Sequence, residues 1–277
     1  MMNPPRISQI GGPTVLIEIG GLRLLTDPTF DPPGEYRLPH VVLRKVAGPA
    51  LAAKQIGPID AVLLSHDQHA DNLDHSGREF LATAARVFTT RAAASRLGGH
   101  VVGLSPWEPV SVTAPDGGEL EIVATPARHG PAGIEPLSGD VVGFVLTMKN
   151  DQNVRSIYIT GDTVWYEGIA EVARRFDVGL VLLFAGAAQT RGPFHLTMDT
   201  NDAIEAAHAF PNATIVPVHT DSWAHLTQSA QDLTRAFEAL GLAHRLNVIE
   251  PGGTWTWRFD ADQASASDRS RSPVHAP

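Results

Sequence analysis

The chain has 277 residues, of which 43% are hydrophobic and 18% are charged, and its formal net charge is -9. This composition is ordinary for a soluble globular enzyme, and it argues against broad nucleic-acid binding, which depends on neutralising phosphates with Lys and Arg. The absence of cysteine excludes disulfides, thiolate metal ligands and a cysteine nucleophile. No integral membrane segment and no signal peptide is recognisable, so we expect a cytoplasmic protein.

The first part of the chain predicts mostly strands. Apolar residues alternate on both sides of Gly20-Gly21, which indicates a hairpin of strands at 15–18 and 22–26. Residues 28–58 are rich in Pro and Gly, and we expect a long functional loop there. The other elements expected before residue 160 are strands at 61–64, 87–89, 109–113, 119–125, 141–148 and 155–160, helices at 77–85 and 91–97, and a turn at 150–153.

The second part alternates between helices and strands. The apolar spacing predicts a helix over 166–176, a helix that ends near Ala209, and a helix that opens at Ser229 with a capping box. Strands are expected at 179–184, 214–218, 246–249 and 254–257. We expect residues 1–259 to form a single domain and residues 260–277, which lack apolar periodicity, to form a disordered tail.

A dense group of potential metal ligands follows the predicted strand at 61–64. The nine residues from His66 to Asp74 contain two imidazoles and three carboxylates. These groups are natural ligands of Zn²⁺ and similar ions, and close spacing lets several reach one ion at little entropic cost.

Further potential ligands follow three later strands. His129, Asp162 and His219 each come at or just after the end of a β-branched, apolar run. Loops at strand ends on a rigid scaffold are common positions for functional sites. The series formed with His66, His69 and Asp71 therefore predicts a metal site.

With these residues in place, the chain resembles the metallo-β-lactamase superfamily. That family has a His-x-His-x-Asp-His motif, then a lone His, an Asp and a final His, each after a strand. The opening at 12–28 resembles the branch of L-ascorbate-6-phosphate lactonase-like and N-acyl phosphatidylethanolamine phospholipase D-like hydrolases. The resemblance covers residues 7–257 and implies an α/β fold, the four-layer αββα sandwich, with the site at one edge of the sheets.

The first motif departs from the family pattern by one inserted residue, because His66 and Asp71 are five residues apart instead of four. Alignment back from Asp71 makes His69 the second histidine and puts Asp67 in place of the first. Alignment forward from Ser65 makes His66 the first histidine and puts Gln68 in place of the second. We favour a small bulge that lets both histidines reach the metal. Asn72 replaces the last histidine of the motif.

The resemblance implies a set of ligands for one or two divalent ions. His66, His69 and His129 would hold the first ion with Asp162, and Asp71, Asp162 and His219 would hold the second. Zinc is the expected ion and manganese the alternative, since oxygen-rich sites suit harder ions. Such an ion makes hydroxide available at neutral pH by acidifying bound water.

The expected function is hydrolysis of a small ester, lactone or phosphodiester, with Asp71 and His195 as candidate catalytic residues. His225, six residues after His219, has a weaker signal. Two alternatives stay open: a phospholipase-like hydrolase at a membrane surface, and a metal-binding member with impaired catalysis and a regulatory or structural role.

Overall fold

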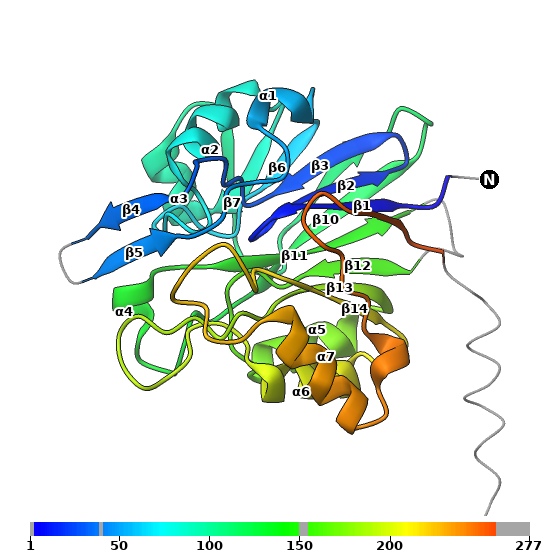
Figure 1. Cartoon of the computed structure of the whole chain (residues 1–277). Helices are drawn as coiled ribbons and strands as arrows, with labels where there is room; N and C mark the ends of the chain where they lie inside the picture. Colours follow the sequence, from blue (N-terminus) through cyan, green and yellow to red (C-terminus); the bar gives the residue numbers. More distant parts are fainter. Residues whose placement is uncertain (1–2, 39–40, 150–154, 259–277) are drawn as a thin grey trace, which may run out of the picture.

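The computed structural model describes residues 3–38, 41–149 and 155–258. Two sheets lie face to face, and helices cover the outer face of each sheet (Figure 1). This is the four-layer αββα arrangement, and the predicted α/β fold class is confirmed. The predicted turn at 150–153 and the predicted tail at 260–277 lie outside the described residues.

The first sheet has the strand order β15-β1-β2-β3-β6-β7-β8. Its strands in chain order are β1 (Arg6–Gly11), β2 (Thr14–Ile19), β3 (Leu22–Thr26), β6 (Ala61–Leu63), β7 (Val87–Thr90), β8 (Val101–Leu104) and β15 (Thr254–Thr256). The predicted hairpin is β2 and β3, which pair antiparallel with Ile19 opposite Leu22. From β3 to β8 the strands run parallel, so their carboxyl ends share one edge of the sheet.

The second sheet has the order β14-β13-β12-β11-β10-β9. Its strands are β9 (Pro109–Thr113), β10 (Glu119–Pro126), β11 (Val142–Met148), β12 (Ser156–Ile159), β13 (Val178–Phe184) and β14 (Thr214–Val218). Strand β11 is antiparallel to both β10 and β12, and β12, β13 and β14 are parallel. Four strands therefore end at the same edge, and the predicted ligands follow three of them.

Strand β13 shows how the sequence separates two apolar layers. All seven of its residues are buried. Leu180 and Leu182 pack into the layer between the sheets, whereas Val181 and Leu183 pack into the layer beneath the helices. Because successive side chains of a strand point to opposite faces, an uninterrupted apolar run is what a strand buried on both faces requires.

The helices lie in two groups. Helices α1 (Ala53–Ile56), α2 (His75–Phe80) and α3 (Arg91–Leu97) lie on the side of the first sheet, and α5 (Glu167–Arg175), α6 (Thr200–Ala209) and α7 (Ala230–Ala239) cover the second sheet (Figure 1). The short helix α4 (Glu135–Ser138) lies on the same side of the molecule as the hairpin described below, at the left of Figure 1. The predicted capping box at Ser229 is confirmed, and Asp199 caps α6.

Several elements differ from the sequence-based expectation. The region expected as a long loop contains a hairpin of β4 (Gly34–Arg37) and β5 (Val42–Lys45), and strands β1 and β8 were not expected. The strand predicted at 246–249 is wrong, because Leu246 makes only an isolated bridge to Ile215. Strand β1 is specified by long-range pairing with β2 and β15, which local patterns do not reveal.

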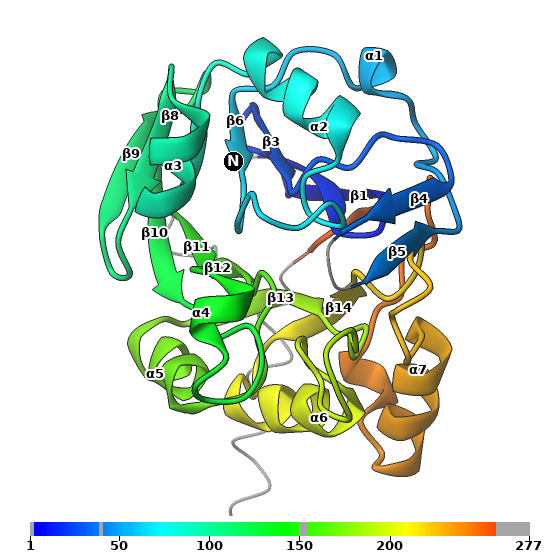
Figure 2. The same cartoon turned by 90° about the vertical axis from the view of Figure 1, so that its left-hand side faces the viewer.

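The hairpin projects from the body of the molecule and is fixed at its base by a buried ion pair (Figures 1 and 2). Lys45 Nζ lies 2.8 Å from Asp74 Oδ2, and the two side chains are 2% and 0% exposed. The Asp74 carboxylate also accepts hydrogen bonds from the backbone N–H groups of Phe30, Asp31 and Gly77. Asp74 thus ties the hairpin and the start of α2 to the loop that carries the first motif.

We expect Lys45→Met to lower the free energy of unfolding by about 3 kcal/mol, because removing one partner leaves a buried charge uncompensated. Denaturant unfolding followed by circular dichroism measures the change. The control is Arg37→Met on β4, whose side chain is 77% exposed and whose loss should cost under about 1 kcal/mol. If Lys45→Met lowers the free energy of unfolding by less than about 1 kcal/mol, the buried Asp74 carboxylate does not need Lys45 as its counter-charge.

Candidate metal centre

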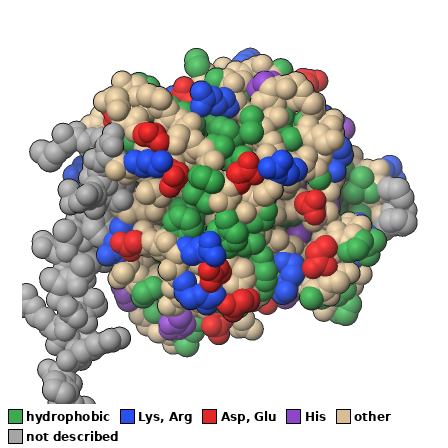
Figure 3. Space-filling view, turned by 180° about the vertical axis from the view of Figure 1, so that it is seen from behind, with side chains coloured by type: hydrophobic (Ala, Val, Ile, Leu, Met, Phe, Trp, Pro, Cys, Tyr) green, Lys and Arg blue, Asp and Glu red, His purple; other side chains and the backbone are tan. Residues whose placement is uncertain are grey.

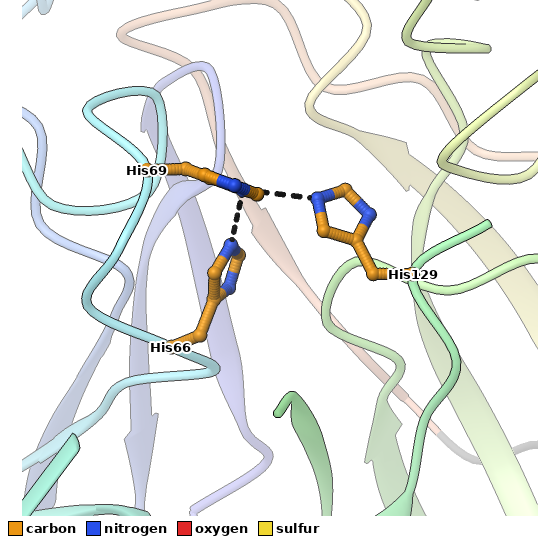
Figure 4. Close-up of side chains that lie close together, drawn as sticks. All are labelled: His66, His69 and His129. Carbon is orange, nitrogen blue, oxygen red and sulfur yellow. Dashed lines mark hydrogen bonds between the residues drawn. The ribbon is translucent and has the colours of Figure 1, made fainter. Parts of the chain in front are cut away.

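The loop after β6 brings both of its motif histidines to one point. His66 Nε2 lies 2.9 Å from His69 Nδ1, and that atom lies 3.0 Å from His129 Nε2. Figure 4 shows the three rings pointing toward one another, with His129 arriving from the loop after β10. One nitrogen of each ring thus belongs to a single compact cluster. Three imidazoles are a typical donor set for zinc.

The inserted residue is accommodated by turning the side chains between the two histidines away from this cluster. The Asp67 carboxylate binds Arg96 of α3 through both of its oxygens, with distances of 3.1 and 3.0 Å from Arg96 Nε. Arg78 donates to the Asp67 carbonyl. Gln68 is exposed and lies against Gly139, where an added Cβ would come within 1.9 Å of its Nε2 atom. His66 and His69 therefore both face the cluster, whereas the two side chains between them do not.

The three imidazoles are held as neutral rings. His129 Nδ1 donates a hydrogen bond to the Leu196 carbonyl at 2.8 Å, which leaves the Nε2 lone pair facing the cluster. Burial lowers the pKa of His69 and of His129 to about 4 and that of His66 well below its usual range, and the neighbouring imidazoles add to the shift. Metal binding requires the neutral form of the imidazole, so these rings are prepared for it.

A second cluster adjoins the first and contains Asp71, Asp162 and His219. His219 Nε2 lies 3.5 Å from Asp71 Oδ2 and 3.7 Å from Asp162 Oδ1. The other oxygen of Asp162 lies 3.5 Å from His129 Nε2. The Asp162 carboxylate therefore stands between the two clusters and presents one oxygen to each.

Asp162 reaches this position because Gly161 precedes it. Gly161 has φ +62°, and an added Cβ would lie 2.7 Å from the Val142 carbonyl oxygen and 3.0 Å from Ser65 Cβ. His219, which follows β14, also adopts the left-handed region with φ 53°. Such backbone conformations in non-glycine residues are costly and occur preferentially at functional sites.

The donor atoms of the second cluster suit a divalent cation. Both oxygens of Asp162 and both ring nitrogens of His219 are buried, and none has a hydrogen-bond partner in the described part of the chain. Buried polar groups are nearly always paired, and a buried carboxylate is costly without a counter-charge. Burial raises the pKa of Asp162. Burial alone would lower the pKa of His219, but the Asp162 and Asp71 carboxylates raise it to about 9. The two carboxylates thus attract a positive charge, which a divalent cation would supply in place of the proton on His219.

Asn72 occupies the position of the missing histidine but does not replace its ring nitrogen. Its Nδ2 atom lies 3.4 Å from Asp27 Oδ2 and 3.5 Å from Ser65 Oγ, and its Oδ1 atom is buried without a partner among the described residues. Asp27 also accepts a 2.6 Å hydrogen bond from the Ser65 backbone, and burial raises the pKa of Asp27 to about 8. Asp27 therefore holds the motif loop through Ser65 and Asn72.

Of the other two candidate histidines, His225 had the weaker sequence signal, but it contacts the second cluster and His195 does not. His225 Nε2 lies 2.8 Å from Asp71 Oδ2. His195 instead pairs its Nδ1 atom with Asp199 Oδ2 at 3.0 Å and is one-third exposed. Its neighbour Leu196 supplies the carbonyl that orients His129. The only sequence signal for His225 was its place on the same loop as His219.

A cavity of about 360 Å³ opens beside His129. Its wall includes Arg128, Ser105 and Thr90, together with residues of the α4 region and the start of α3. The volume lies within the range of small-molecule sites, which is about 300–1,000 Å³. The cavity therefore offers room for a small molecule beside His129, the one member of the two clusters among its lining residues.

Comparison with known proteins agrees with this geometry. Residues 22–220 match the family model of the beta-lactamase superfamily domain. The chain is 26% identical over 261 residues to the UPF0173 protein YddR of Bacillus subtilis, covering 91% of this chain and 99% of that protein. A UPF0173 metal-dependent hydrolase of Caldivirga maquilingensis is 24% identical over 241 residues, covering 85% of this chain and 91% of the relative.

Two solved structures share the fold. An isothiocyanate hydrolase from Delia radicum gut bacteria superposes with a TM-score of 0.78 at 22% identity, covering 92% of this chain and all of that chain. A protein of Veillonella parvula described as a possible metal-dependent hydrolase gives 0.77 at 21% identity with the same coverage. The resemblance noted in the sequence is thus confirmed at the level of the superfamily, and the chain belongs to the metallo-β-lactamase superfamily.

Proposed function

We propose that this protein is a metal-dependent hydrolase that binds one or two divalent cations and cleaves a small ester, lactone or phosphodiester. The observation that carries the proposal is the convergence of two donor clusters on the shared carboxylate of Asp162. The branch of L-ascorbate-6-phosphate lactonase-like and N-acyl phosphatidylethanolamine phospholipase D-like hydrolases remains part of the proposal, as does the cytoplasmic location.

In this proposal His66, His69 and His129 hold the first cation with Asp162, and Asp71, Asp162 and His219 hold the second. Nitrogen-rich donors favour zinc at the first position, and the carboxylates of the second position also suit manganese. A bound divalent cation supplies Lewis acidity and makes hydroxide available at neutral pH.

Residues of the chain itself would position the attacking water and the substrate. Asp71 is proposed to accept a hydrogen bond from the attacking water as well as to bind the second cation. The cavity beside His129 would hold the substrate, and its limited volume favours a small molecule. His195, half-buried next to the carbonyl that orients His129, is proposed to face the substrate.

One observation favours a second candidate, a hydrolase that acts at a membrane surface. Leu38, Val42 and Val46, on or next to the β4–β5 hairpin, are 44%, 41% and 59% exposed. None of the helices in the described part of the chain is long and apolar enough to cross a membrane.

On the face seen in Figure 3, basic and acidic side chains are interspersed, and no single basic field stands out that would favour nucleic acid.

The function is tested by removing one ligand from each cluster. We expect His129→Ala and Asp162→Ala to lower metal affinity by at least about 100-fold and to abolish turnover, because metal ligands contribute more than the second-shell groups that orient them. Metal content is measured by elemental analysis after dialysis. Turnover is measured on p-nitrophenyl esters, a lactone, a phosphodiester and an isothiocyanate, with and without anionic vesicles.

The matched control is His208→Ala, which removes an exposed imidazole from α6 and should change neither metal content nor turnover. Full turnover in either ligand variant would overturn the proposed centre. Turnover that appears only with vesicles would favour the membrane-surface candidate.

The assignment of the inserted loop has its own test. We expect His69→Ala to lower affinity for the first cation by at least about 100-fold, whereas Asp67→Ala should leave it within about threefold, because Arg96 holds that carboxylate outside the cluster. Chelator competition with Zn²⁺ gives both affinities. The opposite ranking would restore the alignment that counts Asp67 as a ligand.

A variant of His195 distinguishes an effect on turnover from an effect on metal binding. We expect His195→Ala to lower kcat by about 100-fold or more, in the range of a lost general acid–base group, and to leave the metal content unchanged. Asp199→Asn, which keeps a side-chain oxygen to cap α6 but removes the charge beside His195, should have a smaller effect on kcat. Unchanged kcat in His195→Ala would show that this histidine does not act on the substrate.

A further inference from the structure

The second cluster has one imidazole fewer than the motif that it otherwise follows. Asn72 stands at the position of that imidazole, and its amide nitrogen lies 3.4 Å from Asp27 Oδ2 and 3.5 Å from Ser65 Oγ, while its side chain also interacts with the Asp162 carboxylate. A neutral carboxamide is not among the usual ligands of zinc. Asp71, Asp162 and His219 alone would leave the second position with a single ring nitrogen.

The loop after β14 brings a further ring nitrogen, that of His225, to the Asp71 carboxylate. His225 Nε2 lies 2.8 Å from Asp71 Oδ2, and its side chain is 10% exposed. The Nδ1 atom of His225 is buried and has no hydrogen-bond partner within the described ranges. The ring is thus neither a surface histidine nor one whose polar atoms the protein has fully satisfied.

The loop that carries His225 is built to hold this position. Trp223 is buried, pairs with Lys45 of the hairpin in an isolated bridge, and lies with its ring 5.9 Å from the His225 ring. The backbone of Ala224 donates to the Arg44 carbonyl at 2.9 Å, and the His225 carbonyl accepts from the Gln189 backbone at 3.0 Å. Contacts from two separate segments therefore fix the approach of His225 to Asp71.

The spacing of His219 and Asp71 is that of a shared coordination shell, and His225 lies within hydrogen-bond distance of the same carboxylate. Donors bound to one cation at about 2.0–2.2 Å lie about 3–3.5 Å from one another. Around Asp71 Oδ2, the Nε2 atoms of His219 and His225 lie at 3.5 and 2.8 Å. Two imidazoles on one loop thus face the same carboxylate oxygen.

We propose that His225 supplies the imidazole that residue 72 does not provide, so that its Nε2 atom completes the second cation position with Asp71, Asp162 and His219. This inference rests on the proposed metal-dependent function. When Nε2 binds the cation, the single proton of the neutral ring resides on Nδ1, and the present hydrogen bond to Asp71 is replaced by a shared cation.

The competing role is that His225 only orients Asp71 by donating a hydrogen bond. Two variants separate these roles. His225→Gln keeps an amide that can donate to Asp71 but is a poor zinc ligand. The double variant Asn72→His with His225→Ala returns an imidazole to the motif position and removes it from the loop.

The experiment measures the number of Zn²⁺ ions per chain and the affinity of each by elemental analysis and chelator competition, with the absorption spectrum of the Co²⁺-loaded protein as a second readout. We expect two ions in the unaltered chain and one in His225→Ala, with affinity for the second ion at least about 100-fold lower and affinity for the first within about threefold. The double variant should regain the second ion, and His225→Gln should not. His208→Ala is the control for loss of an imidazole far from the site.

Two ions bound by His225→Ala with unaltered affinity would overturn the inference, as would full recovery in His225→Gln. An unaltered chain that binds a single ion would overturn the inference but leave the proposed function standing. An unaltered chain that binds none would overturn both. If His225→Ala does not fold, His225→Gln and the double variant still decide between the two roles.

Discussion

The packing of the two sheets through one apolar layer is the interaction on which the metal centre depends. Side chains such as Ile17 of β2 and Phe144 of β11 belong to this single buried layer. Their contact sets the distance between the loop after β6, which carries two imidazoles, and the ends of β10, β12 and β14 on the other sheet. Neither sheet alone could assemble either cluster, because the two clusters draw donors from both.

The burial of three carboxylates is a second constraint on the metal centre. Asp27, Asp71 and Asp162 are all buried, and burial raises the pKa of Asp27 and of Asp162. The carboxylate of Asp71 is the exception, because burial would raise its pKa but His225 and His219 outweigh burial and hold it well below the usual range. The Asp162 carboxylate also faces His219, but burial outweighs that attraction and raises the pKa of Asp162. A divalent cation between the clusters would relieve this imbalance, which links the stability of the site to metal binding.

The loop insertion and the hairpin show how the chain keeps the site while departing from the family motif. Arg96 takes up the extra carboxylate of Asp67, so the insertion changes the loop without adding a charge to the centre. On the opposite side, the Lys45–Asp74 ion pair connects the hairpin to the motif loop. Trp223 packs against Tyr36 of the same hairpin, and His225 follows two residues later. The hairpin therefore contacts the loop that carries His225.

Local sequence patterns were enough to predict several elements of the fold and the strand ends that carry the candidate ligands. The apolar runs of β6, β13 and β14 and the capping box at Ser229 are short-range patterns, and the series from His66 to His219 marks strand ends, where donors gather. The single domain over residues 1–259 stays a prediction.

Other features could not be derived from the sequence. Strand β1 forms only because β2 and β15 bind it, and the hairpin is held by an ion pair between residues 45 and 74. Whether His66, His69 or both face the centre depended on where Arg96 lies, and the position of His225 depended on contacts with residues 44 and 189. The sequence by itself determined which donors exist and which strands they follow, because those patterns are local. Only the tertiary structure decided which donors meet, because the distances between loops are set by packing across the whole sandwich.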